Sequence, residues 1–386
     1  MSHLCDDKTV VQPQEHIDAT LKAADIYGTD RDVDADKLRK LSFQGWKLAL
    51  KRVVREFLSE GLLDLGALLT YFSLLSLAPA LLVGYSLITL FLANESLEIL
   101  SRATELVNQY VPEEQSEVVL NVLDAISGSA AGGRIGLLIG VFVALWTSSA
   151  YVRAFSRCAN AVYGRSEGRA LIRQWAVMVV LNLGLLIGAI LILLSLVINE
   201  TLVMAILGPL AEPLRLTSVL SFLTETFIPV WNWVKWPVIL LVLMVLVATL
   251  YHFAPNVKPV KFRWLSAGSV FAIIGIFLAG GVLNAYFTYF AAFSSYGAVG
   301  SVMAIFIGLW IFNIVLIGGV KIDAESSRAR QLQAGLPAED ANLVRPRSVR
   351  TVAKLEKQQH RLVEQARNFR ASQGLAESSE PDRGTN

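Results

Sequence analysis

Long apolar runs alternate with short charged segments through most of the chain, and this pattern predicts helices that cross a membrane. The hydrocarbon core of a bilayer is about 30 Å thick, so a helix needs roughly 20 consecutive apolar residues to cross it. Runs without Asp, Glu, Lys or Arg mark the candidate spans. They are Leu65–Asn94, Ile135–Val152, Gln174–Asn199, Trp236–Val257 and Trp264–Val320.

The last run is too long for a single crossing. Its 57 residues would form a helix of roughly 85 Å. The polar, aromatic and small residues of Asn284–Gly297 (NAYFTYFAAFSSYG) mark a turn that divides this run in two. The sequence therefore predicts an all-α, polytopic membrane protein with six transmembrane helices.

Shorter apolar and amphipathic segments lie outside these runs. Residues 201–211 and 216–224 are too short to cross and are predicted to form interfacial or re-entrant helices. In residues 43–61, an apolar stripe flanked by basic residues is typical of a helix on the inner membrane surface, and packing on other protein is an equal alternative. The stripe is Phe43, Trp46, Leu50, Val54, Phe57 and Leu58, and the basic residues are Lys51, Arg52 and Arg55.

Basic residues are unevenly divided between the two sides of the membrane. Basic residues are enriched in cytoplasmic loops, so the richer side is predicted to be the cytoplasm, with both termini inside and the protein in a bacterial inner membrane. The polar N-terminal segment carries no pattern of a cleavable signal peptide. One side has Lys47, Lys51, Arg52, Arg55, Arg153, Arg157, Arg165, Arg169, Arg173, Lys258, Lys261, Arg263, Lys321, Arg328 and Arg330, and the other has only Arg102, Arg134, Arg215 and Lys235.

The domain organisation follows from the spans. Residues 1–40 are predicted to be a polar, flexible N-terminal tail, and residues 41–325 a transmembrane domain with an outer helical hairpin at about 95–133. Residues 326–386 are predicted to be a charged cytoplasmic tail that contains a short helix over 354–370 and is disordered at its end.

Composition and motifs exclude several classes of enzyme. Charged residues make up 17% of the chain, against about 25% in soluble domains. Cys5 and Cys158 are predicted to be free thiols. The sequence has no HExxH, GxSxG or P-loop motif and no Cys/His cluster, so we expect no catalytic residue, metal site or cofactor, and no enzyme.

Uncharged polar residues at membrane depth are the remaining candidates for a site. Polar groups in hydrocarbon are costly unless they face the bundle or water. Hydroxyls that bond their own helix backbone, and asparagines that join helices, are the alternative to solute contact. The substrate-pathway candidates are Thr70, Tyr71, Ser73, Ser76, Pro79, Trp146, Ser149, Asn160, Asn284, Trp310 and Asn313.

Two features led to specific hypotheses about this pathway. Pro79 removes a backbone hydrogen bond and is predicted to bend the first span, which would then form a wall of an internal cavity. Tyr71, Trp146 and Trp310 are predicted to surround a cationic group by cation–π attraction, with core packing as the alternative. The spacing of Gly184 and Gly188 favours close helix packing, as does that of Gly136 and Gly140.

Four stretches resemble the YihY / virulence factor BrkB family. They are LLTYFSLLSLAPALL, LWTSSAYVRAFSRCANAVYG, LYHFAPNVKPVKFRWLSAG and YGAVGSVMAIFIGLWIFNIVLIGGVKIDAE, in order between about Gly45 and Ala329. The resemblance implies a six-helix inner-membrane protein. Family members have been labelled ribonuclease BN or linked to serum resistance, and export of small compatible solutes has been proposed. Where the family often has GAE, this chain has GGVKIDAE, with Lys321 before Asp323 and Glu325.

Three functional hypotheses follow from these observations. The first is a secondary-type transporter that exports a small polar or zwitterionic solute. The second is a non-transporting membrane scaffold or envelope-integrity factor, and the last is a membrane-tethered ribonuclease. The expected partners are the lipid bilayer and a small polar solute, not nucleic acid, and a homo-oligomer is left open.

Overall fold

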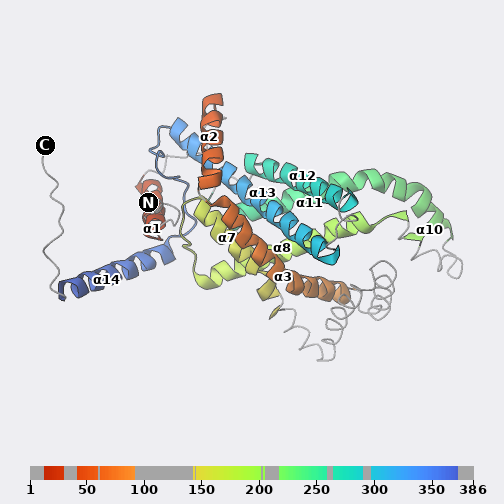
Figure 1. Cartoon of the computed structure of the whole chain (residues 1–386), viewed down its shortest axis with the longest axis horizontal. Coiled ribbons are helices and arrows are strands. Elements are labelled where there is room, and N and C mark those ends of the chain that lie inside the picture. The colour runs from red at the N-terminus through yellow and green to blue at the C-terminus, as the bar shows by residue number, and fades with distance from the viewer. Residues whose placement is uncertain are drawn as a thin grey trace.

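The computed structural model describes residues 13–29, 41–59, 61–91, 142–143, 145–200, 203–204, 217–258, 264–289 and 297–372. Over these ranges the fold is helical, with one isolated bridge between Val257 and Pro346 (Figure 1). The all-α class is therefore confirmed. The helices are α1 (Pro13–Thr29), α2 (Phe43–Ser59), α3 (Leu62–Phe91), α7 (Ala150–Val162), α8 (Leu171–Val197), α10 (Thr217–Phe222), α11 (Ile228–Phe253), α12 (Ala267–Tyr289), α13 (Gly297–Gln333) and α14 (Arg350–Ser372).

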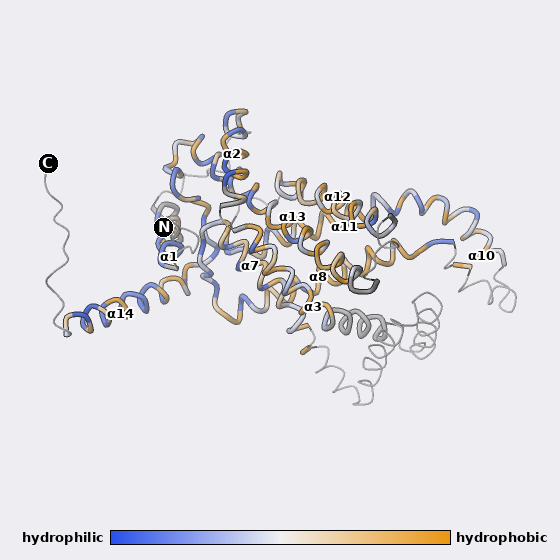
Figure 2. Tube along the Cα trace, in the orientation of Figure 1, coloured by the Kyte–Doolittle hydropathy of each residue, from blue (hydrophilic) through white to orange (hydrophobic). Residues whose placement is uncertain are grey.

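Four of the described helices are long and apolar enough to cross a membrane. These are Leu171–Val197, Leu220–Phe253, Ala267–Tyr286 and Val302–Gln333, and they coincide with the last four predicted spans. Large apolar side chains are exposed along them, as expected for contact with lipid. The hydropathy colouring of Figure 2 shows that these helices are largely hydrophobic. The chain is thus a multi-pass membrane protein.

The other two predicted spans are covered only in part. Helix α3 has 30 residues and occupies the predicted first span, and its segment Leu62–Leu77 is apolar. Residues 135–141 and 144 of the predicted second span lie outside the described residues, as does the predicted hairpin at 95–133. The count of six therefore stays a prediction.

The long helix α13 lies at the centre of the bundle, where it packs against α12, α3, α2 and α7. Leu69, Phe155, Met178 and Ile317 are fully buried in the core that these helices share with α8 and α11. The apolar surface that faces this core comes from all the helices of the bundle, so their packing fixes the positions of the polar groups described below.

Two helix boundaries differ from the prediction. Helix α13 continues past the predicted end at Val320 to Gln333, because Lys321 and Glu325, one turn apart, form an ion pair of 3.4 Å on it. Residues 216–224 were predicted to be an interfacial or re-entrant helix, and their described part, residues 217–224, is helical but does not end before α11. A π-helical turn at Leu223–Phe227 joins α10 to α11 instead, and its wider turn keeps the helix continuous.

Helix α2 forms where the amphipathic pattern predicts a helix. Its buried Ala49 lies outside the stripe, and Phe43, Leu50 and Val54 of the stripe are 85%, 60% and 66% exposed. These three side chains therefore do not pack on the described protein. The membrane surface remains the predicted partner of this stripe.

Parts of both predicted tails are folded at one end of the molecule, opposite α10 (Figure 1). Helix α1 lies within the segment predicted to be a flexible tail, and its Ile17, Thr20 and Ala23 are buried. We call α1, residues 163–170, residues 254–258 and residues 321–372 the cap. Its chain is largely hydrophilic (Figure 2). Hydrogen bonds to the main chain therefore stabilise the cap, whereas apolar contacts stabilise the bundle.

Candidate functional site

A buried hydrogen-bond network joins three helices inside the bundle. The Asn313 amide of α13 donates from Nδ2 to Ser73 Oγ at 3.1 Å and to Thr70 Oγ1 at 3.3 Å, both on α3. The Tyr151 hydroxyl of α7 donates to Asn313 Oδ1 at 2.9 Å. The side chain of Asn313 is fully buried, so this amide links α3, α7 and α13 at a point where unpaired polar groups would be costly.

The hydroxyls of α3 also bond their own helix. Thr70 Oγ1 donates to the Gly66 carbonyl at 2.8 Å, and Ser73 Oγ donates to that of Leu69 at 2.9 Å. Backbone bonding and bonding between helices therefore occur together. Ser76 lies one turn beyond Ser73 and is buried, but its Oγ has no hydrogen-bond partner among the described residues.

The three predicted aromatic residues do not form a shared cage. Tyr71 is 59% exposed and packs edge-on against Phe72, while the Trp310 indole donates to the Leu63 carbonyl at 3.2 Å. The third, Trp146, packs edge-on against Trp175 at 4.0 Å between ring centroids. No described contact joins the three rings, because Tyr71 lies about 100° around α3 from Thr70 and so leaves the buried face.

The remaining pathway candidates occupy separate surroundings. Ser149 is buried, and its Oγ donates to the Trp146 carbonyl at 2.6 Å. Asn284 is exposed on α12, and Pro79 is half-buried within α3, which continues as one helix through it. Asn160 is buried on α7, far along the helix from Tyr151, and its amide donates to Glu167 of the cap. Of the candidates, Thr70, Ser73 and Asn313 form one network between helices, while Ser149 and Trp146 are bonded to each other within a separate segment.

The segment GGVKIDAE fixes α13 to its neighbours. A Cβ atom on Gly268 of α12 would lie 1.9 Å from the Gly319 carbonyl oxygen, so the two backbones touch here. The Asp323 carboxylate accepts hydrogen bonds from the Gly268 amide at 2.8 Å and from the Ser266 hydroxyl. Asp323 thus caps the amino end of α12, where a negative charge is favourable.

Glu325 lies in a cluster of basic side chains at the same end. Its carboxylate is 3.3 Å from Arg52 of α2, 3.4 Å from Lys321 and 4.0 Å from Arg328. Glu325 and Lys321 are both buried. Removing one partner of a buried pair leaves the others uncompensated, so this cluster fastens α2 to α13.

Buried arginines hold the cap together through main-chain carbonyls. The Arg165 guanidinium, only 2% exposed, donates to the carbonyls of Ala19 on α1 at 3.0 Å and of Val344 at 3.2 Å, and also to that of Asn342. Arg169 donates to the last carbonyls of α11, at Phe253 and Ala254. From the sequence these arginines were interpreted as topogenic charges that also contact phosphate or lipid headgroups, and their hydrogen bonds to carbonyls were missed.

Asn256 connects the segments around these arginines. Its amide Nδ2 donates to the carbonyls of Ser166 at 2.9 Å and Ser348 at 3.0 Å, while its backbone N–H donates to Asn160 Oδ1 at 2.6 Å. Neighbouring Gly168 has no room for a side chain, because a Cβ atom there would lie 1.7 Å from the Ser348 carbonyl. The cap is therefore a packed structure and not an extended tail.

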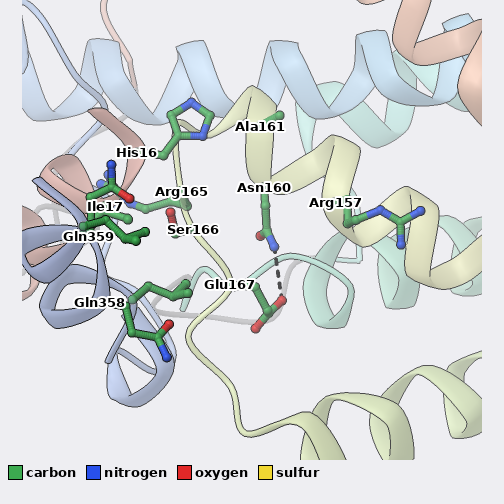
Figure 3. Close-up of a pocket in the computed structure, with 12 residues that line it drawn as sticks. His16, Ile17, Arg157, Asn160, Ala161, Arg165, Ser166, Glu167, Gln358 and Gln359 are labelled. Carbon is green, nitrogen blue, oxygen red and sulfur yellow. Dashed lines mark hydrogen bonds between the residues drawn. The ribbon is translucent and has the colours of Figure 1, made fainter. Parts of the chain in front are cut away.

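A pocket of about 580 Å³ opens between α1, α7 and α14 (Figure 3). Its two walls come from α1 and α14, and its floor comes from α7 and the loop that follows. Within the described part of the chain, no group of three His, Cys, Asp or Glu residues is placed to hold a metal ion. The pocket is lined by His16, Ile17, Arg157, Asn160, Ala161, Arg165, Ser166, Glu167, Leu355, Gln358, Gln359 and Leu362.

The docking of α1 is expected to weaken in acid. Burial lowers the pKa of His16 from its usual 6.5, Glu15 opposes this shift and Arg165 adds to it. The unfolded chain then binds the proton more tightly, so stability is lost as pH falls from about 6.5 toward the lower folded pKa. Protease cleavage within α1 should therefore accelerate between pH 7.5 and 5.5. His16→Gln should flatten this dependence, and the exposed His360→Gln should keep it; equal profiles for the two variants would contradict the assignment to His16.

Comparison with known proteins gives the family. Residues 53–343, more than half of the chain, match the family described as Virulence factor BrkB. The chain belongs to the BrkB family. The ribonuclease-like protein YfkH of Bacillus subtilis (strain 168) is 29% identical over 267 residues, which cover 68% of this chain and 90% of that protein. No solved structure matches.

The region shared with the BrkB family begins within α2 and ends at Leu343. It includes the Asn313 network, the capping Asp323 and the cap arginines Arg165 and Arg169. Helices α1 and α14 lie outside it. The floor of the cap pocket thus belongs to the BrkB region, while both of its walls come from segments outside the match.

Proposed function

We propose that this chain is a secondary-type transporter of the inner membrane that exports a small polar or zwitterionic solute, with both termini and the cap in the cytoplasm. The observation that supports this best is Ser76, one turn beyond the Asn313 network, whose buried hydroxyl has no partner in the part of the chain that the structure describes. An unpaired buried hydroxyl costs about 1–3 kcal/mol. A polar solute that passes along α3 would satisfy it. The transporter needs no cofactor and no catalytic residue.

A membrane scaffold is the second candidate. Helix α14 favours it, because residues 357–372 are exposed along their whole length and carry apolar side chains such as Phe369. A ribonuclease ranks last. The name of the Bacillus relative prompts that hypothesis, but Arg165 and Arg169 are 2% and 5% exposed and bond carbonyls inside the cap, so neither presents its guanidinium to RNA.

Removal of the Ser76 hydroxyl tests for an effect on transport without an effect on stability. We expect Ser76→Ala to leave membrane levels and thermal stability unchanged or slightly higher, since it removes an unpaired buried group. Efflux of glycine betaine from proteoliposomes should nevertheless fall several-fold, and Ser76→Thr should restore it in part.

The matched control is Ser195→Ala on α8. Ser195 is also buried, but its hydroxyl donates to the Leu191 carbonyl at 2.8 Å. Its loss should leave efflux unchanged. Wild-type efflux in Ser76→Ala would remove the observation on which the proposed pathway depends.

A further inference from the structure

The cap pocket brings together three parts of the chain that are far apart in sequence. His16 and Ile17 come from α1, Gln358 and Gln359 from α14, and Arg157 from α7 (Figure 3). Its volume of about 580 Å³ lies in the range of roughly 300–1,000 Å³ that is usual for small-molecule sites. The pocket is therefore large enough for a metabolite and lies outside the membrane-spanning segments.

The positive and negative charges that line the pocket do not balance. The Glu167 carboxylate accepts from Arg169 at 2.7 and 2.8 Å and from Asn160 at 3.1 Å, so its charge is neutralised inside the cap. The lining contains two guanidinium groups, those of Arg157 and Arg165, against this one carboxylate. The pocket therefore carries an excess of positive charge.

Arg157 is the basic side chain that is available to a ligand. It is exposed, and its described contact is a cation–π interaction with Phe72, 5.3 Å from the ring centroid. No carboxylate in the described part of the chain lies within ion-pair distance of it. A guanidinium in this state binds a carboxylate or a phosphate through charge-assisted, frequently bidentate hydrogen bonds.

The walls define the rest of the ligand. The side-chain amides of Gln358 and Gln359 are exposed and make no hydrogen bond within the described residues, so each offers two donors and an acceptor. Ile17, Leu355 and Leu362 add apolar surface beside them. We propose that this pocket binds a small organic anion, with its carboxylate or phosphate on Arg157 and its polar groups on Gln358 and Gln359.

Occupancy of this site would act on both the cap and the membrane bundle. The ligand would bridge α1 and α14, which lie outside the BrkB region, to α7, which lies within it. Arg157 also contacts Phe72, the neighbour of Ser73 on α3. A bound anion would therefore contact Arg157, and Arg157 contacts α3, the helix that carries Thr70 and Ser73 of the Asn313 network. This proposal does not depend on transport.

The test is ligand-induced thermal stabilisation of the full chain, purified in neutral detergent. The probes are succinate, glycerol 3-phosphate and zwitterionic glycine betaine, each compared with sodium chloride at equal ionic strength. We expect at least one anion to raise Tm in a saturable way. Arg157→Gln should weaken the apparent affinity of the protein for that anion about tenfold or more, because a charge-assisted contact is lost. Arg361→Gln, which removes an exposed charge of α14 that does not line the pocket, should match wild type.

A second variant protects the test against misfolding of the first. Leu362→Trp places a large side chain at a wall position that is 59% exposed, and it should block binding with every charge retained. Competition by nanodiscs that contain phosphatidylglycerol would assign the anion to a lipid headgroup, and unchanged affinity in those nanodiscs would assign it to a soluble metabolite. No stabilisation by either anion, equal stabilisation of the two pocket variants and wild type, or a stronger effect of glycine betaine would each overturn the proposal.

Discussion

Gly268→Ala is expected to abolish the folded protein, although it adds a single methyl group. The new Cβ would lie 1.9 Å from the Gly319 carbonyl oxygen and 2.8 Å from its carbonyl carbon. Because both are backbone atoms, no rotamer change relieves the clash. Ordinary overpacking costs about 1–3 kcal/mol, and separation of α12 from α13 should exceed that range. It would also draw the Gly268 amide away from Asp323.

Two glycines provide controls for this prediction. Gly280 lies on the same helix with no atom within 4 Å of an added Cβ, so Gly280→Ala should keep wild-type levels and Tm. Gly275→Ala should fall between, because the atom it meets first, 2.4 Å away, belongs to the movable side chain of Val315. Membrane levels and Tm in detergent measure the series. A Gly268→Ala protein as stable as Gly280→Ala would show that α12 and α13 do not touch here.

Arg165→Met is expected to detach α1 and loosen the cap. It removes the donor that the Ala19, Asn342 and Val344 carbonyls share, so the hydrogen bonds from Arg165 to α1 and to residues 342–344 are lost. Hydrogen bonds that involve a charged group contribute about 1.5–3 kcal/mol each, so the combined loss should be about 3 kcal/mol or more. Arg165→Lys should recover little, because an ammonium lacks the planar fork that reaches several carbonyls.

Limited proteolysis gives the readout for this second prediction. Cleavage between α1 and α2 should release a fragment that separates from Arg165→Met during gel filtration and stays bound in wild type. Arg367→Met, an exposed arginine of α14, is the control for loss of charge. The expectation fails if the fragment stays bound in Arg165→Met.

The membrane helices could be predicted from sequence because a long charge-free run has few other stable forms. Helices α8, α11, α12 and α13 each overlap such a run. A helix forms there because every backbone group in lipid needs a hydrogen-bond partner within the protein. The pairing of Thr70 and Ser73 with Asn313 was also within reach, because buried polar groups in a bundle bond each other or their own backbone.

The cap could not be predicted in the same way. Arg165 and Arg169 bond carbonyls, and every residue has a carbonyl, so no residue type in the sequence marks the partner. Gly268 on one helix contacts Gly319 on another, so neither helix shows a glycine spacing that would predict this contact. By contrast, Gly188 does contact Leu246 closely, as its spacing predicted, whereas Gly184 meets nothing within 4 Å.

The carbonyls that Arg165 binds also set an order for biosynthesis. One partner, Ala19, precedes Arg165 by 146 residues, and the others, Asn342 and Val344, follow it by 177 and 179. While the ribosome translates α8 to α13, the guanidinium has only one of these three acceptors, Ala19. The cap therefore closes last, after the membrane bundle is inserted, and a chain truncated before residue 342 would leave Arg165 without two of its three distant acceptors.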